Sequence, residues 1–168
     1  MRFAVAAALL CASLVAACSK DRTTAPTSNP PAGDFQLARA AGSSLPLLDS
    51  GDSVEVEGRS EYREIYLEQG SLTLTSDVQP RFETRLHYGW YAVTMDASGQ
   101  RHLDLRAALD IRDHGLAHRD SDGTLELESD VTPSIVHHAT PEQGGYTMKY
   151  EQAPTAPPLV LFFRPSTP

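Results

Sequence analysis

Histidine has the broadest chemical use of the residue types in this chain, because its imidazole ring can bind transition metals or transfer protons near neutral pH. The sequence contains six histidines: His87, His102, His114, His118, His137 and His138. His114 and His118 have the closest useful spacing. A separation of four brings ligands together on a helix, but the alternation around Gly115 indicates a strand. We therefore expect these two histidines to be solvated, and they remain the candidate pair for a periplasmic metal site.

Signatures of other catalytic and metal-binding sites are missing from the sequence. The segment 120–123 contains two aspartates before a glycine, but it lacks the donor spacing of an EF-hand loop and is typical of a hairpin turn. There is no Gly-x-Ser-x-Gly motif, no glycine-rich phosphate loop and no His-Glu-x-x-His motif. Both cysteines, Cys11 and Cys18, precede residue 20, so the remainder has no thiol for a nucleophile or a disulfide. We expect a protein that is not an enzyme and needs no cofactor.

A strand face rich in aromatic and aliphatic residues is the remaining candidate for binding. If this face points into a barrel, its side chains either line a cavity for a small ligand or fill the interior. The candidate ligand-binding residues are Phe82, Leu86, Tyr88, Trp90, Tyr146 and Met148. Trp90 directly follows Gly89, and a glycine lets a ligand or another backbone approach closely. The pattern does not separate a lined cavity from a packed core, so both interpretations stay open.

The elements that position these residues are predicted to be strands, because from residue 34 onward apolar side chains recur at every second position. In the segment 81–95 the apolar residues change from even to odd positions after Gly89, which predicts a β-bulge or a bend. In the next segment, mostly polar residues alternate with Leu103, Leu105, Ala107, Leu109 and Ile111. This alternation predicts a half-buried strand.

Turns that contain glycine separate these segments. Hairpin turns are expected at residues 68–71, 96–100, 120–123 and 142–145, where glycine supplies the positive φ that tight turns require. The spacing predicts an all-β fold, a single antiparallel meander of about eight to ten strands. Such a sheet protects its edges by closing into a barrel or by stacking on a second sheet. The apolar segment 159–163 is best placed beside the first strand, where it would close a barrel, and a β-sandwich is the alternative.

Length and charge limit the classes of function. The chain has 168 residues, of which 40% are hydrophobic and 21% are charged. These values fit one globular domain with appendages. The formal net charge is −8, and an acidic protein is poorly suited to binding a phosphate backbone. We therefore expect no nucleic-acid partner.

The first 17 residues have the organisation of an export signal, with a basic start, an uncharged apolar stretch and small residues at the end. Residues 14–18 read Leu-Val-Ala-Ala-Cys, which resembles the lipobox of bacterial lipoproteins. The resemblance implies cleavage before Cys18 and lipidation of its sulfur, so membrane lipid is an expected partner. Several acyl chains give a stable anchor. Ser19 stands where an aspartate retains such proteins in the inner membrane, which implies the periplasmic or surface face of the outer membrane.

The predicted organisation has three parts. Residues 1–17 are the signal peptide, residues 18–33 are the lipidated cysteine with a Pro/Thr-rich tether, and residues 34–168 are the β-barrel domain. The third part resembles the small lipocalin-like, calycin-type domains of bacterial envelope lipoproteins. The residues that carry this resemblance are Phe35-Gln36-Leu37 followed by Leu45-Pro46, then Gly70-Ser71-Leu72-Thr73-Leu74, and finally Phe162-Phe163-Arg164. The resemblance implies a lipocalin-like barrel, and it supports the fold better than the function.

Three functions are compatible with this organisation, and none of them is catalytic. The leading hypothesis is a lipid-anchored lipoprotein that binds a small apolar or amphipathic ligand inside its barrel. The second is an envelope interaction or structural lipoprotein with a solid core, which would depend on exposed charges such as Glu55, Glu57, Asp104 and Arg106. Periplasmic metal binding is the third.

Overall fold

The structure of this chain, a computed structural model, describes residues 32–142, 144–153 and 155–167. The predicted signal peptide, Cys18 and almost all of the predicted tether therefore lie outside the described residues. Within them, the regular elements are β1 (Gly33–Ala40), β2 (Ser43–Ser44), β3 (Leu47–Val56), β4 (Arg59–Leu74), β5 (Arg81–Met95), β6 (Arg101–Arg119), β7 (Leu125–Ser129), β8 (Val136–Glu142), β9 (Gly145–Tyr150) and β10 (Leu159–Pro165). No helix in this part of the chain has the length and apolar character needed to cross a lipid bilayer.

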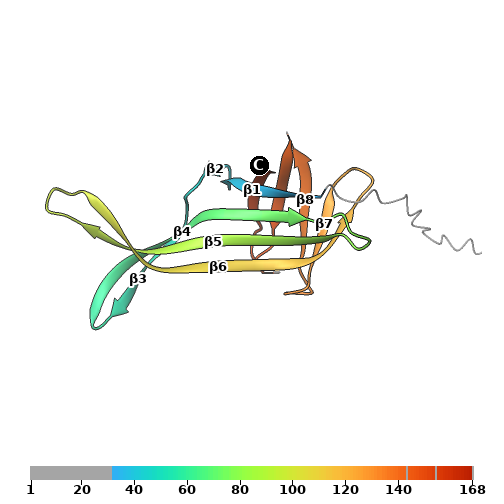
Figure 1. The fold of residues 1–168 in the computed structure, drawn as a ribbon. Helices are drawn as coiled ribbons and strands as arrows, with labels where there is room; N and C mark the ends of the chain where they lie inside the picture. Colours follow the sequence, from blue (N-terminus) through green and yellow to red (C-terminus); the bar gives the residue numbers. More distant parts are fainter. Residues whose placement is uncertain (1–31, 143, 154, 168) are drawn as a thin grey trace, which may run out of the picture.

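The strands form one antiparallel sheet, which confirms the predicted all-β meander (Figure 1). From β3 to β10 each strand pairs with the next one along the chain, and β1 pairs with both β10 and β4. Phe35 of β1 lies opposite Pro165 of β10 on one side and opposite Leu72 of β4 on the other. The first and last strands therefore close a barrel-like ring formed by β1 and β4–β10, as the apolar last segment predicts. Because the described strands belong to one sheet, the alternative of a β-sandwich does not apply.

Side chains fill the interior of the ring. The buried residues of the core cluster are Phe35, Leu37, Ala40, Leu67, Leu72, Leu74, Phe82, Leu86, Tyr88, Ala117, Leu125, Leu127, Ala139, Tyr146, Met148, Tyr150, Leu161 and Phe163. Leu72, Met148 and Phe163 are 0% exposed, so no water-sized space adjoins them. At Gly70 an added Cβ would lie 2.9 Å from the Leu86 side chain and 3.0 Å from that of Leu37. The ring is therefore held together by a densely packed core.

A bulge beside Gly89 divides β5 into two parts, which confirms the predicted irregularity. The pairing of β5 with β6 shifts between Trp90 and Tyr91, so that Arg106 of β6 is the extra residue. An added Cβ at Gly89 would lie 2.8 Å from a carboxylate oxygen of Glu68 and 2.6 Å from the Tyr91 ring. The space at this glycine is therefore used by side chains of its own sheet and not by a ligand.

Beyond the bulge the sheet leaves the ring as a projection. We call this projection the arm, and it consists of β3 with residues 59–66 of β4, 89–95 of β5 and 101–108 of β6. In Figure 1 the β3–β4 and β5–β6 hairpins extend to the left, away from β7 and β8. β3 pairs only with β4, and β7 pairs with β6 only from Gly115 onward. Both edges of the arm are therefore open.

The first part of β6 is exposed, so the prediction of a half-buried strand is wrong here. Residues 101–112 are all exposed, with Leu105 at 54% and Leu109 at 47%. Among the described residues, no second layer covers the apolar side chains of the arm. In addition, Leu105 lies opposite Tyr91 and Leu109 lies opposite Tyr88, on either side of the bulge, so the bulge places the two leucines on opposite faces.

The turn predicted at residues 68–71 is also wrong. β4 continues through this segment without a break, and Gly70 serves close packing with two leucines instead of a change of direction. The turns at residues 96–100 and 120–123 are confirmed, and their glycines have φ values of 81° and 90°. The turn predicted at residues 142–145 lies between the ends of β8 and β9.

Candidate functional site

A pocket of about 390 Å³ lies where the arm joins the ring. Its walls come from the inner face of β4–β6, from the connection between β7 and β8, and from the residues that follow β9. The lining residues are Asp49, Ile65, Tyr88, Trp90, Leu109, Ile111, Arg112, Asp113, Val131, Thr132, Ile135, Tyr150, Glu151 and Gln152. The volume and the apolar character of most of these residues are typical of a site for one small molecule.

The strand register positions the apolar wall of the pocket. Trp90 lies opposite Ile65 of β4 on one side, and Tyr88 lies opposite Leu109 of β6. Residues directly opposite each other in antiparallel strands share a face of the sheet. Trp90 is 37% exposed and Leu109 is also exposed, because the ring ends here and its core no longer covers this face. The same face that is buried inside the ring therefore continues outward as an accessible apolar wall.

Tyr88 places a polar group at the bottom of this apolar wall. Its side chain is 4% exposed, and its hydroxyl makes no hydrogen bond of ordinary geometry with the described residues. Burial, with a further contribution from the negative charge of Asp49, raises the pKa of Tyr88 to about 12, although the Gln152 amide opposes this shift. The phenol is therefore protonated at neutral pH. A buried hydroxyl without a well-aligned hydrogen-bond partner destabilises the fold by about 1–3 kcal/mol.

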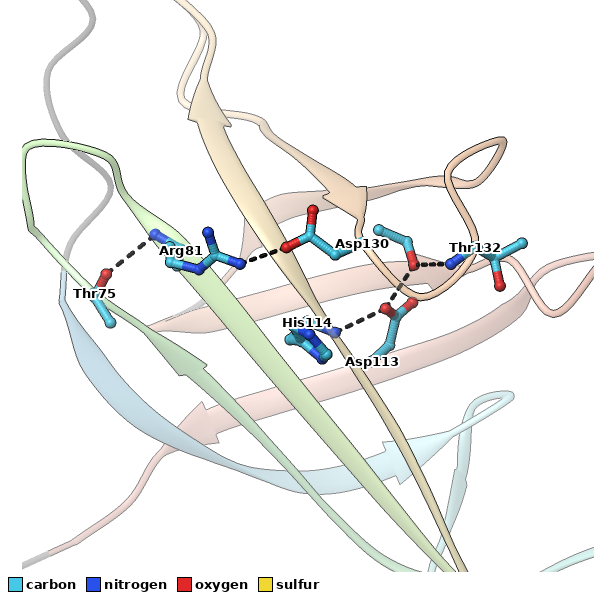
Figure 2. A network of polar contacts seen from close by, with 7 residues as sticks. Thr75, Arg81, Asp113, His114, Asp130 and Thr132 are labelled. Atoms are coloured by element: carbon cyan, nitrogen blue, oxygen red, sulfur yellow. Dashed lines mark hydrogen bonds and ion pairs between the residues drawn. The ribbon is translucent and has the colours of Figure 1, made fainter.

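A buried polar network holds the connection between β7 and β8 against β6 (Figure 2). The Ser129 hydroxyl donates to Asp113 Oδ1 at 2.6 Å and accepts from the backbone N–H of Thr132 at 2.9 Å. The backbone N–H of Asp130 donates to the carbonyl of His114 at 2.8 Å, and the Asp130 carboxylate forms an ion pair with Arg81. These contacts fix the loop that contributes three residues to the pocket wall.

The same network reaches the other loop of the pocket through His137. Its Nε2 lies 2.7 Å from Asp113 Oδ2, and its Nδ1 accepts the backbone N–H of Glu151 at 3.0 Å. Because Nδ1 is the acceptor, the ring proton is on Nε2 and is donated to the carboxylate. The His137 ring stacks on Tyr150 at a centroid distance of 4.5 Å. Asp113 and His137 therefore position both loops that border the pocket.

This arrangement of serine, aspartate and histidine is not a hydrolase triad. A triad places histidine between the serine nucleophile and the aspartate, whereas here Asp113 lies between Ser129 and His137. The serine hydroxyl donates to the Asp113 carboxylate and not to the histidine, and the histidine ring is fully buried. Burial raises the pKa of the Asp113 carboxyl, but hydrogen bonds from His137 and Ser129 outweigh it and hold that pKa below its ordinary value. The aspartate is therefore ionised, and its role is structural.

The structure separates the six predicted ligand-binding residues into two groups. Tyr88 and Trp90 line the pocket. The other four contribute to the packed core: Phe82, Leu86, Tyr146 and Met148. Sequence reasoning did not find Asp49 or the two loops at 131–135 and 151–152. Asp49 is the extra residue of a second bulge, between Leu48 and Ser50, and no sequence pattern marks it.

The candidate metal ligands His114 and His118 both lie on the outer face of β6. Their spacing in an extended strand separates them by about 13 Å, and His118 is instead 3.8 Å from a carboxylate oxygen of Glu128. Among the described residues, no group of three or more histidine, cysteine, aspartate or glutamate side chains could hold a metal ion.

His87 belongs to a separate polar cluster on the outer face of the ring. Its Nδ1 lies 2.7 Å from Asp110, which also forms an ion pair with Arg85. Hydrogen bonds from Arg85 and then from His87 lower the pKa of Asp110 to about 2. These three side chains border a hollow of about 350 Å³. Because they satisfy one another and are partly exposed, they leave no buried polar group that a ligand would have to satisfy.

Comparison with known proteins does not assign this chain to a family. No protein-family model, curated protein or solved structure matches this chain.

Proposed function

We propose that this chain is a lipid-anchored, non-enzymatic lipoprotein of the bacterial envelope that binds a small apolar or amphipathic molecule in the pocket at the base of the arm. The pocket of about 390 Å³ with its accessible apolar wall, at the base of which the buried Tyr88 lies, is the observation that carries the proposal. The packed core of the ring favours this location over the barrel interior. The position of Asp113 between Ser129 and His137 supports a role other than hydrolysis.

The anchor is proposed from the lipobox-like residues 14–18, and outer-membrane residence from Ser19. The fold is compatible with such an anchor. Gly33, where the described strands begin, lies opposite Leu74 at the end of β4, whereas the arm contains the beginning of β4. A tether that leads into Gly33 would therefore join the domain at the end opposite to the arm.

Native mass spectrometry of the full chain with Cys18→Ala, recovered from the soluble periplasmic fraction, tests for a bound molecule. We expect a reproducible small-molecule adduct that is released on denaturation and that solvent extraction identifies. Trp90 is the only tryptophan of the chain, so its fluorescence reports directly on the pocket. Titration with octanol is expected to change this fluorescence and to saturate.

A matched pair of substitutions localises the binding. Leu109→Arg places a long charged side chain in the pocket wall and is expected to abolish the octanol response. Leu103→Arg changes the same residue type on the same strand, at a similar exposure of 44% against 47% for Leu109, but away from the pocket, and is expected to leave the response intact. A clean unliganded mass together with an unchanged Trp90 signal would contradict ligand binding.

Fractionation tests the anchor separately. We expect the wild-type chain to remain with the membranes after a high-salt wash, and Cys18→Ala to be released into the soluble fraction. Persistence of Cys18→Ala with the membranes would contradict the lipobox interpretation.

A second candidate function, binding of an envelope protein by the arm, is favoured by an exposed apolar patch beyond the bulge. Val93 lies opposite Leu103, and Tyr91 lies opposite Leu105, so these side chains share one face. Leu105 and Met95 are largely exposed. Soluble monomers rarely leave large apolar patches uncovered. Crosslinked partners that are lost with Leu105→Asp but kept with Leu109→Arg would support this function, and the absence of any crosslinked partner would contradict it.

A further inference from the structure

The charges that face the pocket all have the same sign. Asp49 projects from the β3 bulge, and Glu151 follows β9 at the opposite rim. Neither carboxylate makes a hydrogen bond or an ion pair with the part of the chain that the structure describes. Arg112 also borders the pocket, but it lies opposite Arg85 in the register of β5 and β6. Arg85 forms an ion pair with Asp110 on the outer face of the ring. Because opposite residues share a face of the sheet, the Arg112 side chain is directed to the outer face, away from the pocket. Asp113 is already satisfied by three donors.

The uncharged groups of the pocket complement a cation. The rings of Tyr88 and Trp90 offer aromatic surface, and aromatic faces attract ammonium groups. An ammonium group brings donors and no acceptor, and the Asp49 carboxylate can accept from it. A carboxylate or phosphate would instead face two unpaired carboxylates.

We propose that the pocket selects amphiphiles with a protonated amine over neutral and anionic molecules of the same size, with the ammonium beside Asp49 and the apolar part against Trp90. This inference rests on the proposed ligand-binding function and specifies its ligand class.

Three probes with the same chain and different head groups test the selection: octylammonium, octanol and octanoate. Each is titrated into the full chain with Cys18→Ala at pH 7 and low salt, with Trp90 fluorescence as the readout. Exposed charge pairs are worth about 0.2–1 kcal/mol, so octylammonium is expected to bind about 1.4- to fivefold more tightly than octanol. Octanoate is expected to bind more weakly than octanol. The preference for the cation should shrink at high salt, because salt screens exposed charges.

Asp49→Asn is the decisive variant, and Asp52→Asn is its control on the same strand. We expect Asp49→Asn to remove the preference of octylammonium over octanol, taken as the ratio of the two affinities within the same variant, and Asp52→Asn to retain that ratio.

The outcomes distinguish the inference from the function on which it rests. Equal affinities for the three probes, or tightest binding of octanoate, would overturn the selection of cations and leave ligand binding intact. A cation preference that survives Asp49→Asn would also overturn it. If none of the probes changes the Trp90 signal, the proposed function fails and the inference fails with it.

Discussion

Replacing Asp113 with asparagine tests whether the buried network holds the pocket together. The carboxylate accepts three hydrogen bonds. Ser129 Oγ at 2.6 Å and the backbone N–H of His114 at 2.7 Å donate to Oδ1, and His137 Nε2 at 2.7 Å donates to Oδ2. Asparagine has nearly the same shape, so the substitution changes one acceptor into a donor and leaves the packing volume almost unchanged.

Neither orientation of the new amide satisfies every partner. With its oxygen at the Oδ1 position, the NH₂ group faces the Nε2–H of His137, and moving that proton to Nδ1 would place it against the Glu151 N–H. With the oxygen at the Oδ2 position, the NH₂ group faces the His114 N–H, which cannot reorient. A lost bond to a charged group costs about 1.5–3 kcal/mol, and an unsatisfied buried donor costs about 1–3 kcal/mol. We therefore expect Asp113→Asn to lower the free energy of unfolding by about 3–5 kcal/mol.

Such a loss is large, since a domain of this size is stable by about 5–15 kcal/mol. Urea unfolding followed by Trp90 fluorescence measures it, with the free energy extrapolated to water. Asp110→Asn is the control. Asp110 is three residues earlier on the same strand, and it and its partners Arg85 and His87 are partly exposed, so we expect a much smaller shift of the midpoint. The variant should also bind octanol more weakly, because both pocket loops lose their common support.

A loss below about 1 kcal/mol for Asp113→Asn, with an unchanged dependence on urea, would refute this reasoning. It would mean that the two loops are held by their own backbone contacts and that the carboxylate is dispensable.

Three other measurements follow from the packing, the charge of the network and the exposure of the arm. Gly115→Ala is expected to destabilise the fold by more than about 2 kcal/mol in urea unfolding, because the new Cβ would overlap the Glu128 carbonyl oxygen and lie 2.9 Å from its carbon. Gly33→Ala, whose Cβ would have an ordinary contact at 3.5 Å, should change the stability little, and equal effects would contradict the packing argument. The lowered pKa of Asp113 means that its contribution is present above the unfolded-state pKa of about 3.9 and is lost as the pH falls through the lower folded-state pKa. The stability gap between the wild type and Asp113→Asn should therefore narrow below about pH 4, and a gap that widens in acid would contradict it. Leu105→Asp should leave the thermal midpoint unchanged, because the leucine is already exposed, and a large decrease would mean that the arm is covered in solution.

The ring could be predicted from the sequence because period-two alternation and apolar end segments are local signals. The segment 159–163 has no polar face, and a strand next to β1 is the place where it becomes buried. The arm could not be predicted, because the leucines from 103 to 109 alternate as they would in a buried strand. These leucines stay uncovered because the short β7 pairs with β6 only from Gly115 onward, so the ring does not extend as far as residues 103–109. The alternation within β6 carries no information about the length of β7.

The pocket was predictable only in part. Tyr88 and Trp90 stand out as aromatic residues at a change of parity, and the pocket lies at that change. The polar network joins Asp113 to Ser129 and His137, which are 16 and 24 residues further along the chain. Each of these residue types is common on surfaces, so their convergence in the interior leaves no local pattern in the sequence.

The arm also gives the molecule an uneven resistance to local opening. Its strands have full ladders of backbone hydrogen bonds, but beyond the bulge they bury few apolar side chains, and the free energy of opening depends largely on that burial. Amide hydrogens near residues 57 and 98 should therefore exchange with solvent orders of magnitude faster than those at Leu72 or Leu127 in the ring. Trp90 lies on the boundary between these two regimes. A molecule bound against Trp90 would slow amide exchange along the arm. Occupancy of the pocket would therefore reduce the mobility of the hairpin turns near residues 57 and 98 without any change in the average structure.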